Sequence, residues 1–214
     1  MLLKRAGKAV HDWGELPSDG EIAAILYAAM YSRKSKAAAA VAALTLWGLR
    51  PLQVAKIRAK DVSVHEGLLK VSVYPAKGGT PTVYGAYLDY QISFPTLRGN
   101  RVYLRPAYLI SYWAAKARPD ERLYGSVRAI EYILQRCSKI AVEILHPSEI
   151  KLLGKRSIVP RDFRRWVLTN IAMREGILPA RYVGGHTSIQ ATQYYVPRTV
   201  DPETIAKYVS PRGG

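Results

Sequence analysis

In most segments of the chain apolar residues recur with the spacing typical of helices, and in a few they gather in short runs typical of strands. The Ser-x-x-Glu capping box at Ser18 predicts an amphipathic helix to about Arg33. The alanine-rich stretch 36–47 is apolar all round, which is typical of a buried helix. Gly48 should end it, and Pro51 suits the first position of a third helix. The first quarter of the chain is therefore predicted to be helical.

The next part of the chain changes to short runs of β-branched and aromatic residues. Three such runs cover 62–64, 68–74 and 82–88, and glycine-containing turns separate them. Short runs divided by turn residues predict an antiparallel meander of three strands. Residues 89–105 are more polar and are predicted to form a loop.

Helical spacing returns after this region. Helices are predicted from Pro106 to about Arg118, over 127–144 behind the cap Ser126, over 162–175, from Pro179 to Gly184-Gly185, behind Ser188 and over 201–209. Residues 146–159 are predicted to be a loop. The fold class is therefore α+β, mainly α, with a small three-stranded antiparallel sheet. One domain is expected over 17–200, with an N-terminal arm (1–16) and a C-terminal tail (201–214).

Composition points to a polyanionic partner. Thirty-two Lys and Arg residues against 16 Asp and Glu give a net charge of +16 and an isoelectric point near 10.0, and such basic chains commonly bind nucleic acid. Cys137 is the single cysteine, so an internal disulfide is excluded and a cytoplasmic setting is expected. The alanine-rich uncharged run 37–49 is too short to cross a bilayer. No signal-peptide core precedes it, so no membrane association is expected.

The candidate chemistry gathers in one stretch, residues 160–195. Arg164 lies in the first turns of a predicted helix, Gly185-His186 follows a glycine turn, and Tyr195 stands nine positions after His186. This order and spacing resembles the C-terminal signature of the tyrosine recombinases, the integrase family that includes the Xer and Cre enzymes. The family's pattern is His-x-x-Arg, then Leu-Gly-His, then a nucleophilic tyrosine. The spacing selects Tyr195 over its neighbour Tyr194.

Two further residues take site roles through the resemblance alone. Arg50, after Gly48-Leu49, corresponds to the family's first catalytic arginine, which a glutamate normally follows three residues later; here that residue is Gln53. Lys77, at the tip of the second predicted hairpin, corresponds to the lysine that reaches the DNA minor groove, with Lys70 as the fallback. Its implied role is general acid for the departing 5′ oxygen.

The implied reaction needs neither a metal ion nor ATP, and no cofactor is expected. Tyrosine attack on a phosphodiester would form a 3′-phosphotyrosyl link, with Arg50, Arg164 and His186 stabilising the phosphorane. Arg161 stands where the family has a histidine. An arginine cannot accept a proton at neutral pH, so it can contact the phosphate but cannot activate Tyr195.

Three functions follow from these residues and stay open. The first is a site-specific recombinase acting on double-stranded DNA, a tetramer on DNA and a monomer or weak oligomer otherwise. The resemblance implies a mobile-element origin for it, such as an integrase of an archaeal virus or plasmid. The second is type IB topoisomerase-like relaxation. The third is a catalytically impaired DNA-binding module, favoured by Gln53 and Arg161. The family's separate core-binding domain is not apparent in the sequence, so either a catalytic fragment or a minimal enzyme is expected.

Overall fold

The computed structural model describes residues 15–32, 36–75, 80–186 and 189–193. Two residues with a predicted site role, Lys77 and Tyr195, lie outside these ranges, as do the predicted cap Ser188 and the predicted helix over 201–209. The described α-helices are α1 (Asp19–Met30), α2 (Ala37–Trp47), α3 (Pro51–Lys56), α4 (Pro106–Lys116), α5 (Val127–Ile144), α6 (Pro160–Glu175), α7 (Ile177–Gly184) and α8 (Ile189–Gln193).

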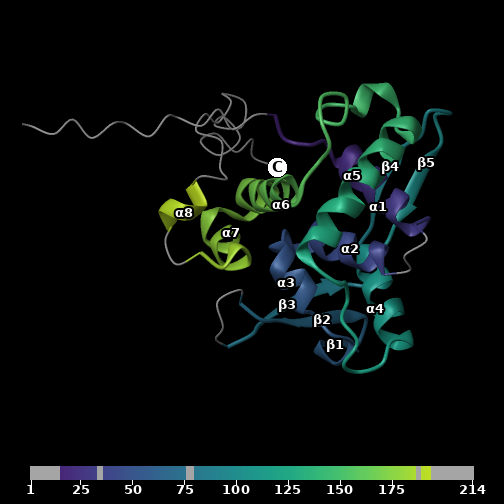
Figure 1. Cartoon of the computed structure of the whole chain (residues 1–214). Coiled ribbons are helices and arrows are strands. Elements are labelled where there is room, and N and C mark those ends of the chain that lie inside the picture. The colour runs from purple at the N-terminus through teal and green to yellow at the C-terminus, as the bar shows by residue number, and fades with distance from the viewer. Residues whose placement is uncertain (1–14, 33–35, 76–79, 187–188, 194–214) are drawn as a thin grey trace, which may run out of the picture.

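Helix α2 forms the centre of the helical part, as its uniform hydrophobicity predicts. All but one of its residues are buried, and it packs against α1, α4, α5 and α6 (Figure 1). Alanine side chains are small, so neighbouring helices can approach this one closely on every side. Fully buried Ile130 of α5 and Phe163 of α6 belong to the same core. Helix α6, which carries Arg164, therefore packs against a buried helix.

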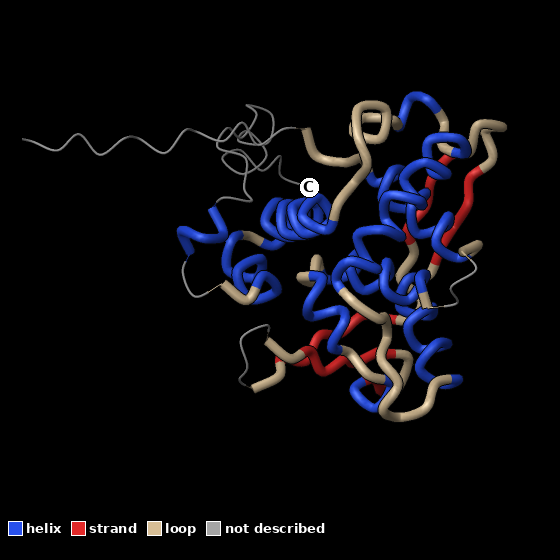
Figure 2. The backbone as a smooth tube through the Cα atoms, viewed as in Figure 1, coloured by secondary structure: helices blue, strands red, loops and turns tan. Residues whose placement is uncertain are grey.

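The three-stranded sheet is confirmed. Strands β1 (Val62–His65), β2 (Leu68–Val73) and β3 (Thr82–Tyr87) pair antiparallel in the order β1-β2-β3. Leu69, Val71 and Val73 alternate with more exposed residues along β2 and are buried, which gives the sheet one apolar face. Figure 2 shows this sheet at one end of the molecule, beside α3.

The predicted polar loop over 89–105 is wrong, because it contains a second hairpin. Strands β4 (Ile92–Pro95) and β5 (Arg101–Leu104) pair antiparallel, with Phe94 opposite Val102. Phe94 is fully buried, and β4 packs on α1. A two-stranded hairpin is marginal alone, so this one depends on the helix beneath it.

Two helix starts also differ from the prediction. Helix α6 begins at Pro160 rather than Asp162, because proline is well tolerated at the first helical position. Asp162 instead supplies the cap: its carboxylate accepts a hydrogen bond from the backbone N–H of Val159 at 2.9 Å. Helix α7 begins at Ile177, directly after Gly176, and takes in Pro179 within its first turn.

A buried carboxylate joins the start of α1 to the predicted loop 146–159. Glu21 is fully buried, and its two oxygens accept hydrogen bonds from the backbone N–H groups of Ser18, Lys151 and Leu153 at 2.7–2.9 Å. The Ser18 hydroxyl caps the helix and also donates to the carbonyl of Glu149 at 2.7 Å. The capping box predicted from the sequence therefore also fixes a segment 130 residues away.

Among the helices of the described residues, none combines the length and the apolar character that a bilayer crossing requires.

Candidate functional site

Arg164 of α6 is the centre of the candidate site. Its side chain is buried, and its guanidinium lies between two carbonyls from distant parts of the chain. Nη1 donates to the Gly48 carbonyl at 3.1 Å, and Nη2 donates to the Gly184 carbonyl and to His186 Nε2, the latter at 2.9 Å. A buried charge is tolerated only when it is well hydrogen-bonded. These contacts supply that condition and fix the guanidinium in place.

Gly48 allows α6 to approach the end of α2 closely. It has a left-handed backbone conformation with φ of +57°. A Cβ atom at this position would lie 2.9 Å from the Arg164 Cα and 3.2 Å from the Val167 Cβ. Glycine is therefore required here for its conformation and for the contact. The sequence predicted only that it ends the helix.

Arg50 stands two residues after Gly48, directly before α3. Its side chain is exposed, and among the described residues it makes no hydrogen bond or ion pair. Its backbone N–H donates to Gln53 Oε1 at 2.9 Å. The amide of Gln53 thus makes the capping contact that a carboxylate would make at this position. The charge of Arg50 reaches the site, because it helps to lower the pKa of His186.

His186 follows the turn that ends α7. Gly185 takes a left-handed conformation, with φ of +58°, and the backbone N–H of His186 donates to the Arg181 carbonyl at 3.1 Å. Burial, and then the positive charges of Arg164 and Arg50, lower the pKa of His186 to about 4. The imidazole is therefore neutral near pH 7.

The hydrogen-bond partners of His186 also define which nitrogen carries the proton. A guanidinium can only donate, so Nε2 must accept the hydrogen bond from Arg164. In the neutral ring the proton then lies on Nδ1, which donates to Thr192 Oγ1 at 3.0 Å. Thr192 belongs to α8 and is fully buried.

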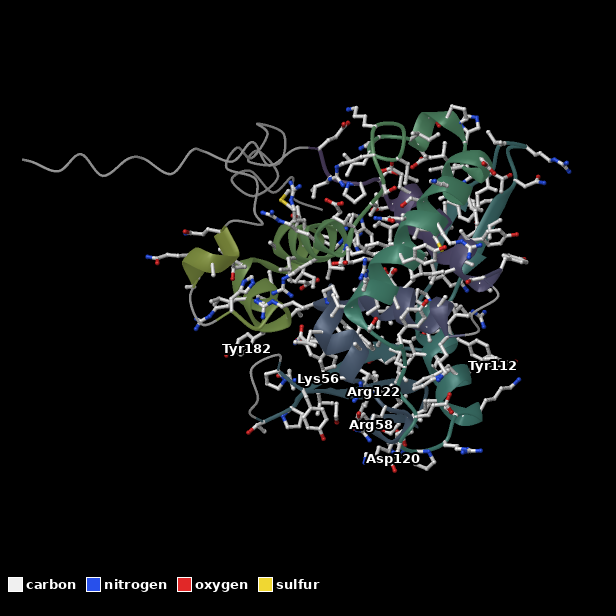
Figure 3. All side chains as sticks on the ribbon, viewed as in Figure 1. Lys56, Arg58, Tyr112, Asp120, Arg122 and Tyr182 are labelled. Atoms are coloured by element: carbon white, nitrogen blue, oxygen red, sulfur yellow. The ribbon has the colours of Figure 1, made fainter. Side chains whose placement is uncertain are left out.

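Two residues without a predicted role link the region of the sheet to helices α7 and α3. Tyr84 of β3 is buried, and its hydroxyl donates to the Val183 carbonyl of α7 at 3.1 Å. Burial raises the pKa of Tyr84, while Arg164 and Arg50 act in the opposite direction. Lys56, which is labelled in Figure 3, ends α3 and donates to the Pro75 carbonyl at 3.1 Å; in the sequence Pro75 stands two positions before Lys77.

Arg161 is exposed on the first turn of α6, one turn before Arg164. The next residue, Asp162, is buried and accepts two hydrogen bonds from the Arg156 guanidinium at 2.6 and 2.8 Å. This ion pair raises the pKa of Arg156. It neutralises a buried carboxylate at the start of the helix and so supports the segment that presents both α6 arginines.

Of the six residues with a predicted catalytic role, the structure brings Arg50, Arg164 and His186 together. Arg161 is on the same helix as Arg164. Lys77 and Tyr195 lie outside the described residues; in the sequence Tyr195 stands two positions after the end of α8. Tyr84 and Thr192 were not singled out from the sequence, because nothing in a strand or helix pattern marks a hydrogen bond to another element. Gly48 was predicted to end its helix, but its close contact with α6 was not predicted.

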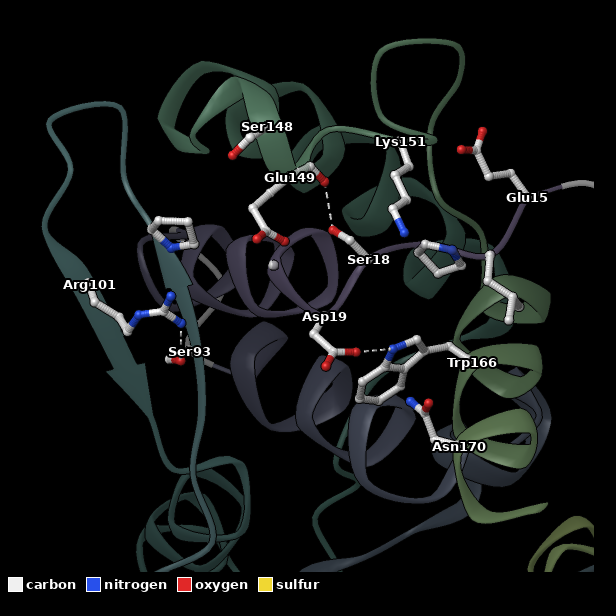
Figure 4. Close-up of a pocket in the computed structure, with 14 residues that line it drawn as sticks. Glu15, Ser18, Asp19, Ser93, Arg101, Ser148, Glu149, Lys151, Trp166 and Asn170 are labelled. Carbon is white, nitrogen blue, oxygen red and sulfur yellow. Dashed lines mark hydrogen bonds between the residues drawn. The ribbon is translucent and has the colours of Figure 1, made fainter. Parts of the chain in front are cut away.

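A separate hollow of about 640 Å³ lies near α1, α6 and the β4–β5 hairpin (Figure 4). The Trp166 indole lines this hollow and donates to the Asp19 carboxylate at 2.8 Å. Arg101 and Ser93, on the hairpin, lie along one wall and are hydrogen-bonded to each other. Arg50, Arg164 and His186 together form what we call the arginine–histidine site. None of these three residues lines this hollow.

Neither a protein-family model nor a curated protein matches the chain by sequence. Solved structures do match. They include the XerA recombinase (TM-score 0.63, 16% identity, 94% of this chain and 66% of that chain). A second is the XerH site-specific recombinase bound to palindromic difH substrate, with a TM-score of 0.61 and 12% identity; the match covers 92% of this chain and 53% of that chain. A third is the Tn1549 transposon integrase in complex with circular intermediate DNA, with a TM-score of 0.52 and 13% identity; the match covers 88% of this chain and 62% of that chain.

These neighbours are tyrosine recombinases, and the chain has their fold. At identities of 10–16% the likeness concerns the fold alone. The chain spans between 53% and 66% of the length of the matched structures.

Proposed function

We propose that this chain is a tyrosine-type site-specific recombinase that cleaves and rejoins double-stranded DNA. The observation that carries this function is the meeting of Arg164 and His186, 22 residues apart, through a 2.9 Å hydrogen bond beside Arg50. The same residue types occupy this order in the family's signature, and the fold is the family's fold.

The two arginines suit the phosphorane that forms when a phosphodiester is attacked. Arginine presents its N–H groups in a planar fork that matches two phosphate oxygens, whereas lysine acts as a point charge. Arg164 is preorganised by its carbonyl contacts, so little reorganisation would be needed when the transition state forms. Arg50 is exposed and could close onto the outer face of the phosphate.

Tyr195 is the proposed nucleophile. Its phenolic oxygen would attack phosphorus, form the 3′-phosphotyrosyl bond and expel the 5′ oxygen, which takes a proton from Lys77. The bond energy stays in the phosphotyrosine ester, so the reverse attack by a 5′ hydroxyl needs neither ATP nor a metal ion. Water or another group must accept the Tyr195 proton, because Arg161 cannot.

His186 would become a donor when DNA binds. The scissile phosphate is negative, so its arrival would oppose the effect of the arginines and raise the pKa of His186. Protonated His186 would give up the hydrogen bond from Arg164, donate from Nε2 to the phosphate and keep its Nδ1 contact with Thr192. This change would convert an internal acceptor into a third phosphate ligand.

The proposed partner is double-stranded DNA, on which the protein would act as a tetramer. The net charge of +16 supports a polyanionic partner. Structures of the XerH recombinase and the Tn1549 integrase are complexes with DNA. Integration of a viral or plasmid genome is the proposed context.

The test is covalent trapping on a nicked duplex from which the cleaved end diffuses away. Wild-type protein should form a protein–DNA adduct without added metal, and Tyr195→Phe should form none. Tyr194→Phe is the matched control and should still form it. An adduct that survives in Tyr195→Phe would exclude Tyr195 as the nucleophile.

The same experiment separates the alternatives. Tight binding with no adduct on candidate attachment sites or supercoiled plasmid would favour the impaired DNA-binding module, which Arg161 at the family's histidine position supports. Metal-independent relaxation of any supercoiled plasmid, without paired sites, would favour the topoisomerase-like activity instead.

A further inference from the structure

We propose that Thr192 is a positioning residue: its hydroxyl stabilises the Nδ1–H tautomer of His186, the form that can accept from Arg164, and joins α8 to the arginine–histidine site. The inference about the tautomer rests on the described structure alone. The consequence for strand cleavage rests on the proposed function.

The burial of Thr192 is the first observation. Its side chain is fully buried although it carries a hydroxyl. A buried hydroxyl without a partner is destabilising, so its contact with His186 Nδ1 at 3.0 Å matters for the packing of α8. Helix α8 contacts α7, and this hydrogen bond links it to the turn that follows α7.

The second observation is the conflict that would arise without the hydroxyl. Nδ1–H of His186 would then lose its described acceptor, which would weaken the preference of the proton for Nδ1. At Nε2 it would face the Arg164 N–H, placing one donor against another. The oxygen of Thr192 thus supports the tautomer in which Nε2 accepts from the buried guanidinium, and it remains an acceptor when His186 is protonated on both nitrogens.

The third observation is the position of Thr192 in the chain. It lies in the last turn of α8, three residues before Tyr195. A contact at this point would hold the segment before the nucleophile against the group that binds the phosphate. Proximity of this kind contributes strongly to rate, because a small displacement of the reacting groups is costly.

The direct test uses ¹⁵N NMR of the imidazole in the protein without DNA. Wild type should show His186 as the Nδ1–H tautomer. Thr192→Val keeps the size of the side chain but removes the acceptor, so it should shift the ring towards the Nε2–H form, and Thr192→Ser should retain the wild-type spectrum. An unchanged tautomer in Thr192→Val would overturn the inference.

A matched control is available at Thr45. This threonine is also buried, and its hydroxyl donates to the Val41 carbonyl at 2.9 Å within α2. Thr45→Val makes the same chemical change and should leave the His186 spectrum unaltered. If Thr192→Val does not fold, Thr192→Ser and Thr192→Cys decide the question, because they differ in one atom and sulfur is a weak acceptor. Equal tautomer populations in that pair would contradict the inference.

The second readout is single-turnover cleavage of the nicked duplex. Thr192→Val should cleave about 10–100-fold more slowly than wild type, the range known for removing the hydrogen-bond partner of a metal-binding histidine, with DNA affinity within about twofold. Thr192→Ser should stay within about threefold of wild type. Wild-type cleavage with an altered tautomer in Thr192→Val would overturn the positioning role. An inactive wild type would instead count against the proposed function, while the NMR result would still decide the tautomer.

Discussion

Gly48 shows how one residue without a side chain places a charged one. Its carbonyl accepts from Arg164, and its Cα lies so near α6 that a methyl group would collide with the helix backbone. The chemistry expected of Arg164 therefore depends on a position that carries no chemical group.

Gly48→Ala should destabilise the protein by about 2–4 kcal/mol, because it combines an unfavourable positive φ with a steric clash. Gly99→Ala is the matched control. Gly99 also has a positive φ, +81°, but a Cβ there would meet no atom within 4 Å, so it should cost only about 1–2 kcal/mol. Urea denaturation measures both. Equal losses would mean that contact with α6 does not matter.

His186 gives the stability a specific pH dependence. Its pKa is lowered to about 4 by burial and by the two arginines, against 6.5 for the ordinary group. The unfolded chain therefore binds a proton in a window where the folded protein does not, and stability should fall as the pH decreases from about 6.5 to about 4. His186→Gln should flatten this part of the curve. His65→Gln, at the exposed end of β1, should leave it unchanged; the opposite pattern would place the titrating group elsewhere.

At this scale the sequence located the chemical groups but not what holds them. Arg164 and His186 were found because their order and spacing are local. Tyr84 and Thr192 act through hydrogen bonds to Val183 and His186, across elements. Such contacts depend on how helices and strands pack, which no periodicity encodes.

Among the secondary-structure elements, α1 and the 149–153 segment form a unit through Glu21. Glu21→Gln replaces one carboxylate oxygen with a donor that would face a backbone N–H. We expect a loss of about 1–3 kcal/mol in urea denaturation. Glu143→Gln removes the same charge from an exposed position on α5 and should change stability by less than about 0.5 kcal/mol. A similar loss of stability in both variants would mean that the change in net charge, and not the lost hydrogen bonds of Glu21, causes the effect.

Helices with caps and glycine stops were predictable to within a few residues, and α5 matches its predicted range of 127–144. The β4–β5 hairpin was not. Pro95 within β4 and the turn at Gly99-Asn100 favour a loop locally, whereas the burial of Phe94 against α1 stabilises the strands. Packing by a distant helix overrode local preference.

For the molecule as a whole, the excess of positive charge should dominate DNA affinity. Phosphate contacts release counterions, so affinity for a nonspecific duplex should fall by about two orders of magnitude or more between 50 and 200 mM salt. Fluorescence anisotropy measures this, with a neutral osmolyte at matched osmolality as the control. An affinity that barely changes with salt would mean that phosphate contacts are not its main source.

The contacts of Arg164 have a consequence for any comprehensive survey of variants. Because its guanidinium joins the segments around residues 48, 164 and 184, nearly every substitution at position 164 should be depleted even in a selection that scores only cellular abundance. Position 50 should behave differently, since the exposed Arg50 side chain supports no other described segment. Its variants should persist under selection for abundance and disappear only under selection for strand transfer.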